Sequence, residues 1–318
     1  MARGDRNNRA HKPRRDIYQE VTSRILELLD AGVAPWRRPI KRSAHGDGMP
    51  KSFSTGKNYR GINVFLLAMT SWAHGYESDY WATFNQVKKN QGAVKKGEKS
   101  TLVVFWKQAT TKDKESGEEI TIPVLRHYNV FNAEQCEGVN APDQVDEEVQ
   151  AEPFIPIEEA DSIVTNYANG PLVVHIGSAA MYLPSTDTVR IASPDRFEAR
   201  ESYYATLFHE LVHSTGHKSR LNRGLNEAPA PFGSLDYSKE ELVAEMGAAF
   251  LCATAGISPP TIEQSAAYID GWRKKLKDDK KLVVQAAGQG QRAADHIQGH
   301  EWSNRTQMPN RPPSYIQS

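Results

Sequence analysis

Cysteine is scarce in this chain of 318 residues, which contains only Cys136 and Cys252. Two isolated cysteines cannot build a disulfide framework or a cysteine-type zinc site, so we interpret them as small core residues in a reducing cytosol. The chain also lacks an apolar run near the roughly 18 residues that span a bilayer, and its N-terminus lacks the apolar core of a signal peptide. These absences lead us to expect a cytoplasmic protein with no membrane partner.

Net charge is also absent, because 39 Lys and Arg residues are matched by 39 Asp and Glu residues. The balance conceals a split between the two halves. Residues 1–107 contain 20 Lys and Arg against 9 Asp and Glu, a net charge of +11, and the remainder carries −11. The chain is long enough for two domains, each with its own core. We therefore predict a basic, polyanion-binding half joined to an acidic half.

Periodicity and composition divide the chain into two ordered segments. We predict a disordered basic arm at 1–15, a small basic α+β domain at 16–138, an acidic linker at 139–153, a second α+β domain at 154–298 and a flexible tail at 299–318. Apolar spacings of three and four predict helices that begin near residue 16 and end near residue 32, and at 64–73, 157–167, 262–277 and 282–297. Alternating patterns predict strands at 101–106, 121–132, 172–176, 180–183 and 188–191, with a hairpin tip at 110–120.

Aromatic and basic side chains alternate in the first domain. Bases stack on aromatic rings with about 1–3 kcal/mol each while Lys and Arg neutralise phosphates, so this pattern is typical of proteins that bind single-stranded nucleic acid. The candidate DNA contacts are Trp36, Arg37, Arg38, Lys57, Tyr59, Arg60, Lys88, Lys89, Lys95 and Lys96. Other rings have a structural alternative, namely the core of the domain: Trp72, Tyr80, Trp81, Phe84 and Trp106.

The second domain contains the motif H-E-x-x-H, formed by His209, Glu210 and His213. Residues four apart share one face of an α-helix, so both imidazoles can bind one metal ion. Glu210 then lies beside that ion, where a carboxylate serves as the general base of a zinc hydrolase. The predicted strands just before this helix match the organisation of zincins, in which an edge strand can pair with extended substrate. The motif predicts a zinc-dependent peptidase site.

The third metal ligand has two candidate positions. His217 is the nearer one, but the metzincin pattern H-E-x-x-H-x-x-G-x-x-H would place its third histidine at Ser219. Further along, Glu241 and Glu245 lie four apart on an apolar helix and resemble the gluzincin E-x-x-x-D arrangement. That resemblance implies Glu241 as the ligand and Glu245 as the carboxylate that orients a ligand histidine, and the reverse assignment stays open.

Taken together, the two halves resemble the ArdC family of plasmid antirestriction proteins, also found fused in TraC-type conjugative primases. The matching motifs are TGKNYRGIN at 55–63, VKKGEK at 94–99, YNVFN at 128–132, YATLFHELVH at 204–213 and EELVAE at 240–245. The resemblance implies an N-terminal single-stranded DNA-binding domain and a C-terminal zincin-like metallopeptidase domain. It further implies a bacterial, plasmid-associated protein that protects incoming plasmid DNA from host restriction during conjugation.

Our principal hypothesis is a protein that binds single-stranded DNA and carries a peptidase site for Zn²⁺, with another divalent metal such as Mn²⁺ as the alternative. A protein substrate bound near the same DNA would meet this site at high effective concentration. The competing hypothesis is a non-catalytic protein that coats single-stranded DNA and has a structural or vestigial metal site. A nuclease is disfavoured, because the basic half lacks the carboxylate clusters of two-metal phosphodiester cleavage.

Overall fold

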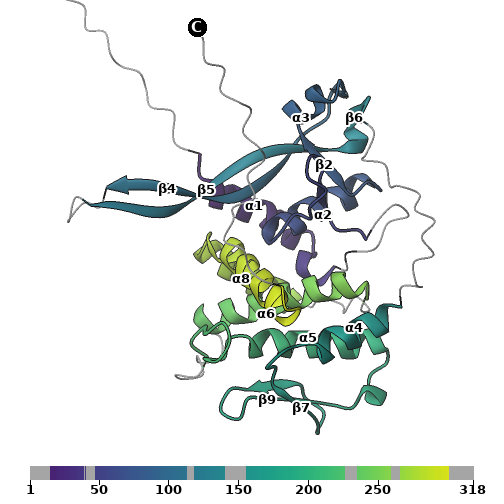
Figure 1. The fold of residues 1–318 in the computed structure, drawn as a ribbon, viewed down its shortest axis with the longest axis vertical. Coiled ribbons are helices and arrows are strands. Elements are labelled where there is room, and N and C mark those ends of the chain that lie inside the picture. Colours follow the sequence, from purple (N-terminus) through teal and green to yellow (C-terminus); the bar gives the residue numbers. More distant parts are fainter. Residues whose placement is uncertain are drawn as a thin grey trace, which may run out of the picture.

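The computed structural model describes residues 15–38, 40, 47–112, 118–139, 155–225, 235–258 and 266–300. Its α+β fold places helices in the middle of the molecule, with a larger sheet at one end and a smaller sheet at the other (Figure 1). The predicted arm up to residue 14, the acidic linker from residue 140 and the tail from residue 301 lie outside the described residues. Within the described ranges, no helix has both the length and the apolar character needed to cross a bilayer.

The first helix, α1 (Ile17–Asp30), follows from its apolar spacing and its N-terminal cap. The Asp16 side chain accepts a hydrogen bond from the backbone N–H of Gln19, which satisfies a donor that a helix start leaves open. Val21, Ile25 and Leu29 are buried along one face of the helix. The short 3₁₀ helix η1 (Pro35–Arg37) comes next and continues into the same core.

The first half is built on a four-stranded sheet with the strand order β1-β2-β5-β4. These strands are β1 (Lys51–Ser52), β2 (Tyr80–Thr83), β4 (Thr101–Lys112) and β5 (Glu119–Asn132). Helix α2 (Ile62–His74) packs beside the edge strand β4, where the Asn63 amide donates to the Val104 carbonyl at 2.7 Å and accepts from its N–H at 2.8 Å. This half also contains α3 (Phe84–Lys89), η2 (Ala133–Gln135) and the paired strands β3 (Ala93–Val94) and β6 (Cys136–Glu137).

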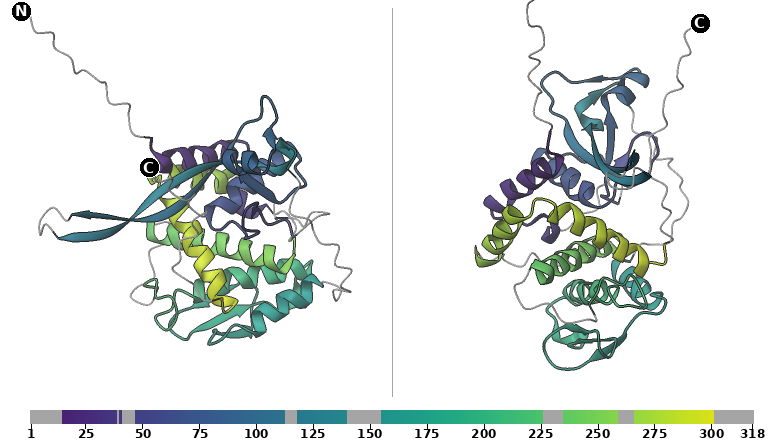
Figure 2. Two further views of the ribbon diagram at one scale, coloured as in Figure 1. Left: turned by 45° about the horizontal axis from the view of Figure 1, so that its top comes forward. Right: turned by 90° about the vertical axis from the view of Figure 1, so that its left-hand side faces the viewer.

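The second half combines a small sheet with a layered set of helices (Figure 2). Its sheet has the order β7-β9-β8, so β8 is an edge strand that pairs antiparallel with β9. The elements are α4 (Pro156–Thr165), β7 (Leu172–His175), β8 (Met181–Leu183), β9 (Thr188–Ile191), η3 (Pro194–Arg196), α5 (Arg200–Ser214), α6 (Leu235–Ala255), α7 (Ala266–Asp278) and α8 (Leu282–Ile297). Helices α5 and α6 pack against each other and carry the candidate metal site.

One hydrophobic core runs through both halves. Ile25 of α1 and Phe65 of α2 belong to the same buried cluster as Met246 of α6 and Val283 of α8. The ring centroids of Phe65 and Phe250 lie 5.1 Å apart across the junction. Two smaller clusters, one around Trp81 and one around Cys136, lie in the first half alone. The expectation of a separate core for each half is therefore wrong for the largest cluster, which joins the halves.

The fold class, two α+β domains, is confirmed, and most predicted elements lie where the patterns placed them. The structure extends the hairpin beyond the prediction, because β4 continues to Lys112 and β5 begins at Glu119. The short helix α3 was missed; it depends on a capping box in which Thr83 and Gln86 bond each other's backbone N–H groups. Phe84 and Trp106, expected in the core, are 47% and 41% exposed.

Candidate metal centre

The candidate metal centre begins on α5, whose apolar residues hold it in the core. Leu207, Phe208 and Leu211 are buried, which fixes the rotation of the helix and directs His209 and His213 to one side. The Nε2 atoms of the two imidazoles lie 3.1 Å apart. The i, i+4 spacing therefore aims both nitrogens at one point, as the motif predicts.

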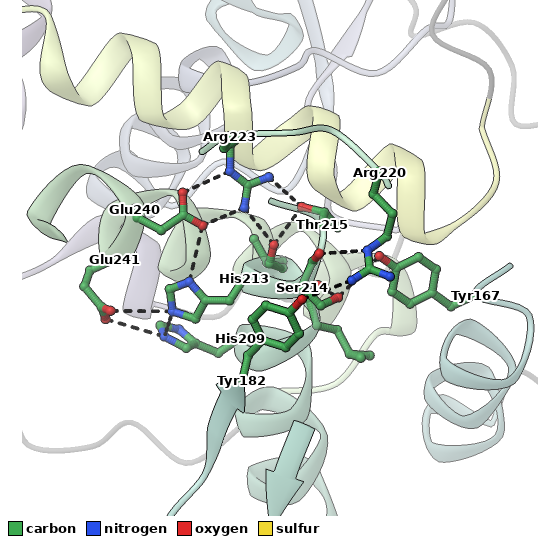
Figure 3. Close-up of polar contacts among 12 residues, drawn as sticks. Tyr167, Tyr182, His209, His213, Ser214, Thr215, Arg220, Arg223, Glu240 and Glu241 are labelled. Atoms are coloured by element: carbon green, nitrogen blue, oxygen red, sulfur yellow. Dashed lines mark hydrogen bonds and ion pairs between the residues drawn. The ribbon is translucent and has the colours of Figure 1, made fainter. Parts of the chain in front are cut away.

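The neighbouring helix α6 supplies a carboxylate at that point (Figure 3). Glu241 places Oε2 3.6 Å from Nε2 of His209 and Oε1 3.5 Å from Nε2 of His213. The three donor atoms lie within 4.8 Å of one another. Two imidazoles and one carboxylate are a donor set suited to zinc, and three protein ligands leave a coordination position open. The residues present thus fit a divalent metal ion.

The electrostatics of the site also favour a cation. Burial lowers the pKa of the His209 imidazole, but its hydrogen bond to Glu241 and the negative charges of Glu245, Glu210 and Glu241 outweigh that effect. The net shift of the His209 pKa is upward, which shows that the surrounding carboxylates stabilise positive charge there.

The carboxylate beside the second ring nitrogen of His213 is Glu240, whereas the gluzincin resemblance gives the task of orienting a ligand histidine to Glu245. Glu240 Oε1 lies 3.3 Å from Nδ1 of His213. Arg223 donates to both oxygens of Glu240, at 2.6 Å and 2.9 Å, and to the Val212 carbonyl near the end of α5. Burial raises the pKa of Glu240, but the hydrogen bonds from Arg223 and His213, together with their positive charges, lower the pKa by more, so its net shift is downward. Glu240 therefore remains an ionised acceptor for His213.

Glu245 instead joins the two halves of the molecule. Its Oε1 accepts hydrogen bonds from Arg37 at 2.6 Å and from the Tyr268 hydroxyl at 3.1 Å. The Arg37 guanidinium lies 4.0 Å from the centre of the Tyr268 ring, and Trp36 Nε1 donates to the same hydroxyl at 3.0 Å. Trp36 is only 3% exposed. Trp36 and Arg37 were both expected to contact DNA. Trp36, however, is too buried to stack on a base, and Arg37 already has a carboxylate partner.

His217 lies outside the cluster of donor atoms. Its Nδ1 bonds the Ser219 hydroxyl at 2.7 Å, just beyond the end of α5. Among the described residues, the only cluster of metal-binding side chains contains Glu241 and not His217. The geometry thus favours Glu241 over both His217 and Glu245 as the third donor.

The candidate base Glu210 is tied to the edge strand of the small sheet. Its side chain is almost fully buried, and Oε2 accepts a hydrogen bond from the Tyr182 backbone N–H of β8 at 2.7 Å. The Tyr182 hydroxyl donates to Asp187 at 2.8 Å, and Arg220 pairs with the same carboxylate. Strand β8 therefore holds Glu210 beside the two histidines. The strand is itself held by a network of ion pairs and hydrogen bonds to which Tyr182 and Arg220 belong (Figure 3).

The remaining DNA candidates fall into two groups. Some are engaged within the protein: Arg60 pairs with Asp295 of α8, Tyr59 packs against the cluster around Trp81, and burial raises the Tyr59 pKa to about 12. Arg38 is exposed, although its guanidinium lies 4.5 Å from the Trp72 ring. The lysines are exposed, namely Lys57, Lys88, Lys89, Lys95 and Lys96. Lys95 Nζ also donates to a backbone carbonyl at 2.8 Å.

Two parts of the chain match described protein families. Residues 15–131 match the N-terminal domain of anti-restriction factor ArdC, and residues 158–289 match a zincin-like metallopeptidase. The uncharacterized protein y4eC of Sinorhizobium fredii is 33% identical over 297 residues, which cover 90% of this chain and 92% of the relative. The DNA primase TraC of Escherichia coli is 33% identical over 306 residues, which cover 91% of this chain but only 27% of TraC.

Solved structures give the same result. The metal-free crystal structure of the antirestriction protein ArdC from plasmid R388 is 38% identical, with a TM-score of 0.70, and the match covers 89% of this chain and 97% of that one. Its Mn(II)-bound structure has a TM-score of 0.69 at 38% identity, with 90% and 98% covered. The chain belongs to the ArdC antirestriction family, with an ArdC-type N-terminal domain followed by a zincin-like domain.

Proposed function

We propose that this chain is an antirestriction protein with a metal-dependent, gluzincin-like peptidase site and a single-stranded DNA-binding N-terminal half. The observation that carries the peptidase proposal is the convergence of His209, His213 and Glu241 within 4.8 Å, with Glu210 on the same helix turn. A closed structural zinc site would need a fourth protein ligand, and the three donors here leave space for a substrate atom.

Each residue has a task in this proposal. His209, His213 and Glu241 hold the ion, and Glu240 keeps the His213 ring in place through Nδ1. When bound, a divalent ion supplies Lewis-acid polarisation of a carbonyl and acidifies water. Glu210 accepts the proton from the attacking water, and the Tyr182 amide holds its carboxylate in position. Strand β8 is an edge of the small sheet, so an extended peptide can pair with it beside these groups.

The metal in this proposal is Zn²⁺, with Mn²⁺ as the alternative. Imidazole and carboxylate donors accept both ions, and the Mn(II)-bound ArdC crystal structure shows that a relative binds manganese. Metal-content analysis of the purified protein, followed by peptidase assays after reconstitution with each ion, distinguishes the two.

The DNA-binding part rests on the exposed lysines and on the likeness to the ArdC N-terminal domain. Lys88 and Lys89 on α3, with Lys95 and Lys96 just beyond β3, lie on the part of the molecule remote from α5 (Figure 1). Exposed cations on a basic half attract phosphates, and a DNA-bound protein substrate would be brought close to the peptidase site.

The deciding experiment uses Glu210→Gln in the full chain. We expect this variant to bind metal and single-stranded DNA like the wild type but to cleave a test protein substrate about 10²–10⁴-fold more slowly, since the general base is lost. His217→Ala is the matched control, because that residue lies outside the donor cluster. Unchanged cleavage by Glu210→Gln would contradict the peptidase proposal.

A second candidate function is protection of DNA by coating alone. The separation between the exposed lysines around α3 and the metal centre favours it, because phosphate binding there needs no help from α5 (Figure 1). The same variant distinguishes the two functions. If Glu210→Gln fully protects DNA from a restriction enzyme, protection is independent of the peptidase; if protection is lost, the two activities are linked.

A further inference from the structure

The hairpin formed by β4 and β5 extends well beyond the other strands of the sheet. Its register runs from the pair Thr101 and Val130 to the pair Lys112 and Glu119. Strand β2 pairs with β5 only at the base of the hairpin, from Val130 to Asn132, and β1 pairs with β2 alone. The outer part of the hairpin therefore projects from the body of the molecule (Figures 1 and 2). Both faces of this outer part can therefore meet a partner, unless another element covers them.

One face carries a pair of stacked aromatic rings. Phe105 and Tyr128 occupy diagonal positions on neighbouring strands, with ring centroids 4.7 Å apart and planes inclined by only 5°. Tyr128 is 42% exposed, and Phe105 is partly exposed. Leaving two large rings partly in water forgoes burial that the core would provide, which suggests a partner for them. A nearly parallel, partly open ring pair is the arrangement on which a planar base can stack.

The same face carries positive charge. Arg126 pairs with Phe105 in the register, and Lys107 lies two positions further along β4. Since paired residues and alternate residues share a face, the described members of this face are Thr101, Val103, Phe105, Lys107, Ala109, Thr111, Ile120, Ile122, Val124, Arg126, Tyr128 and Val130. None of these described residues is acidic. Two cations beside two rings complement a chain of phosphates and bases.

The opposite face of the hairpin is engaged with the protein. Trp106 contacts Tyr18 of α1, with ring centroids 6.2 Å apart, and His127 bonds Arg15 at 2.7 Å. Leu125, which pairs with Trp106, is buried in the main core. The two faces thus differ. One packs on α1, whereas the other is buried only at its base, where Val103 and Val130 join the cluster around Trp81. Beyond that base it presents Phe105, Tyr128, Lys107 and Arg126.

We propose that the face of the β4–β5 hairpin with the two stacked rings is a base-stacking platform for single-stranded DNA. Tyr128 and Phe105 contact bases, and Arg126 and Lys107 contact phosphates. The platform rests on the proposed DNA binding by the N-terminal half and specifies where that binding takes place. Stacking on rings tolerates any base, so the platform binds single strands without sequence preference and discriminates against duplex, whose bases are already stacked.

The first test is photo-crosslinking of the full-length wild-type protein to a single-stranded oligonucleotide that contains 5-iododeoxyuridine. This base cross-links to aromatic rings that stack on it, and peptide mapping identifies the ring. We expect cross-links at Tyr128 or Phe105. Cross-links only at other rings, such as the 47% exposed Phe84, would overturn the platform while leaving DNA binding by this half intact.

The second test compares affinities of single-ring variants of the full chain. We expect Tyr128→Ala to weaken binding to single-stranded DNA about 5- to 100-fold, and Tyr128→Phe to bind like the wild type, because the ring and not the hydroxyl does the stacking. Trp106→Ala is the matched control, since that ring is similarly exposed but lies on the opposite face. Melting temperatures of all variants establish that each remains folded.

The salt dependence tests the charged part of the platform. Replacing Arg126 with Gln should reduce the slope of log affinity against log salt by about 0.7, the value for one phosphate contact on a single strand.

Full affinity of Tyr128→Ala together with an unchanged salt slope of Arg126→Gln would overturn the platform. No binding by the wild type would overturn the proposed DNA function as well. If the face binds a second copy of this chain instead, Ile122→Ser would dissolve a dimer seen by sedimentation without changing DNA affinity, which also contradicts the platform.

Discussion

His213 is the residue on which the candidate metal centre depends most closely, because it is contacted on both ring nitrogens. Its Nε2 points towards His209 and Glu241, and its Nδ1 lies 3.3 Å from Glu240. A carboxylate at the far nitrogen fixes the tautomer and the ring orientation and makes the ligand more basic. Arg223 in turn holds Glu240, so a chain of contacts from Arg223 through Glu240 fixes the ring of His213 and the position of its Nε2 atom.

We predict that Glu240→Gln weakens metal binding about 10- to 100-fold, because the neutral amide no longer stabilises charge on the imidazole. Titration of the metal-free protein with Zn²⁺ in competition with a chelator measures the effect. Glu245→Gln is the informative comparison. The sequence pattern makes Glu245 the residue that orients a histidine, whereas the structure pairs it with Arg37. A larger loss of metal affinity in Glu245→Gln than in Glu240→Gln would contradict the structural assignment.

Asp187 provides a prediction for pH dependence. The hydrogen bond from Arg220 is the main cause that holds the Asp187 pKa below its usual 3.8. Because the pKa of this carboxyl is depressed in the folded protein, the ion pair stabilises the fold fully above the unfolded-state pKa and is lost as the pH falls through the folded-state pKa. The Arg220 side chain is 2% exposed, so its charge depends on this partner.

Asp187→Asn should therefore lower the free energy of unfolding by about 1–3 kcal/mol at pH 7, since Arg220 keeps its backbone acceptors but loses its counter-charge. The difference from wild type should stay constant down to about pH 5 and shrink below pH 3.8. Urea unfolding of both proteins at several pH values measures it. Asp278→Asn, at an exposed helix end, serves as control with an expected change below about 0.5 kcal/mol. A pH-independent difference would show that the pair does not act through charge.

At the scale of elements, α6 and α8 approach so closely that their contact leaves no room for a side chain at Gly290 of α8. A Cβ atom built on Gly290 would lie 2.9 Å from the Gly247 nitrogen and from the Val243 carbonyl oxygen. These are backbone atoms of α6, which cannot move away without shifting the helix that carries Glu240 and Glu241. The absence of a side chain at Gly290 thus allows the short distance between α8 and the helix that carries the candidate metal ligand.

We predict that Gly290→Ala lowers the free energy of unfolding by about 1–3 kcal/mol through overpacking. Gly288→Ala is a matched control in the same helix. A Cβ there meets nothing within 4 Å, so the better helix propensity of alanine should leave stability equal or up to about 1 kcal/mol higher. Thermal or urea unfolding of the wild type and the two variants measures these differences in stability. Equal stability of both variants would show that α6 and α8 can separate without cost.

The elements that the sequence predicted are those whose signal is local. Helix α5 and its metal-binding face follow from apolar spacing and from an i, i+4 motif within one turn of helix. The choice between Glu240 and Glu245 could not be predicted, because it depends on Arg223 and Arg37, which are distant in the sequence. Trp36 was expected to contact DNA because it lies among basic side chains, yet its ring contacts Tyr268 and Trp272. Burial by a distant helix leaves no trace in local composition.

At the scale of the whole molecule, the opposite charges of the two halves partly neutralise each other. Arg37 and Arg60 of the basic half pair with Glu245 and Asp295 of the acidic half. The charge split that predicts polyanion binding is thus in part an internal feature of the fold. The positive charge that has no carboxylate partner across the two halves lies on exposed lysines and on the hairpin, and the proposed DNA binding depends on it.

The shared core leads to a prediction about cooperativity. Helices α1 and α2 of the first half bury Ile25 and Phe65 against α6, α7 and α8. Separating the halves would expose apolar surface on both, and each Å² exposed costs a free energy of roughly 25 cal/mol. We expect the full chain to unfold in one transition by calorimetry. We also expect a protein cleaved at a protease site inserted within residues 140–154 to elute as one complex with a nearly unchanged melting temperature.

Residues 1–138 produced alone should then be poorly soluble or lack a cooperative transition, and should recover both properties when mixed with the second half. Two separate transitions in the full chain, each reproduced by an isolated half, would contradict a shared core. That outcome would also change how DNA binding is measured. With a shared core, affinities must be determined on the intact chain, because the isolated first half would present to DNA an apolar surface that the native protein buries.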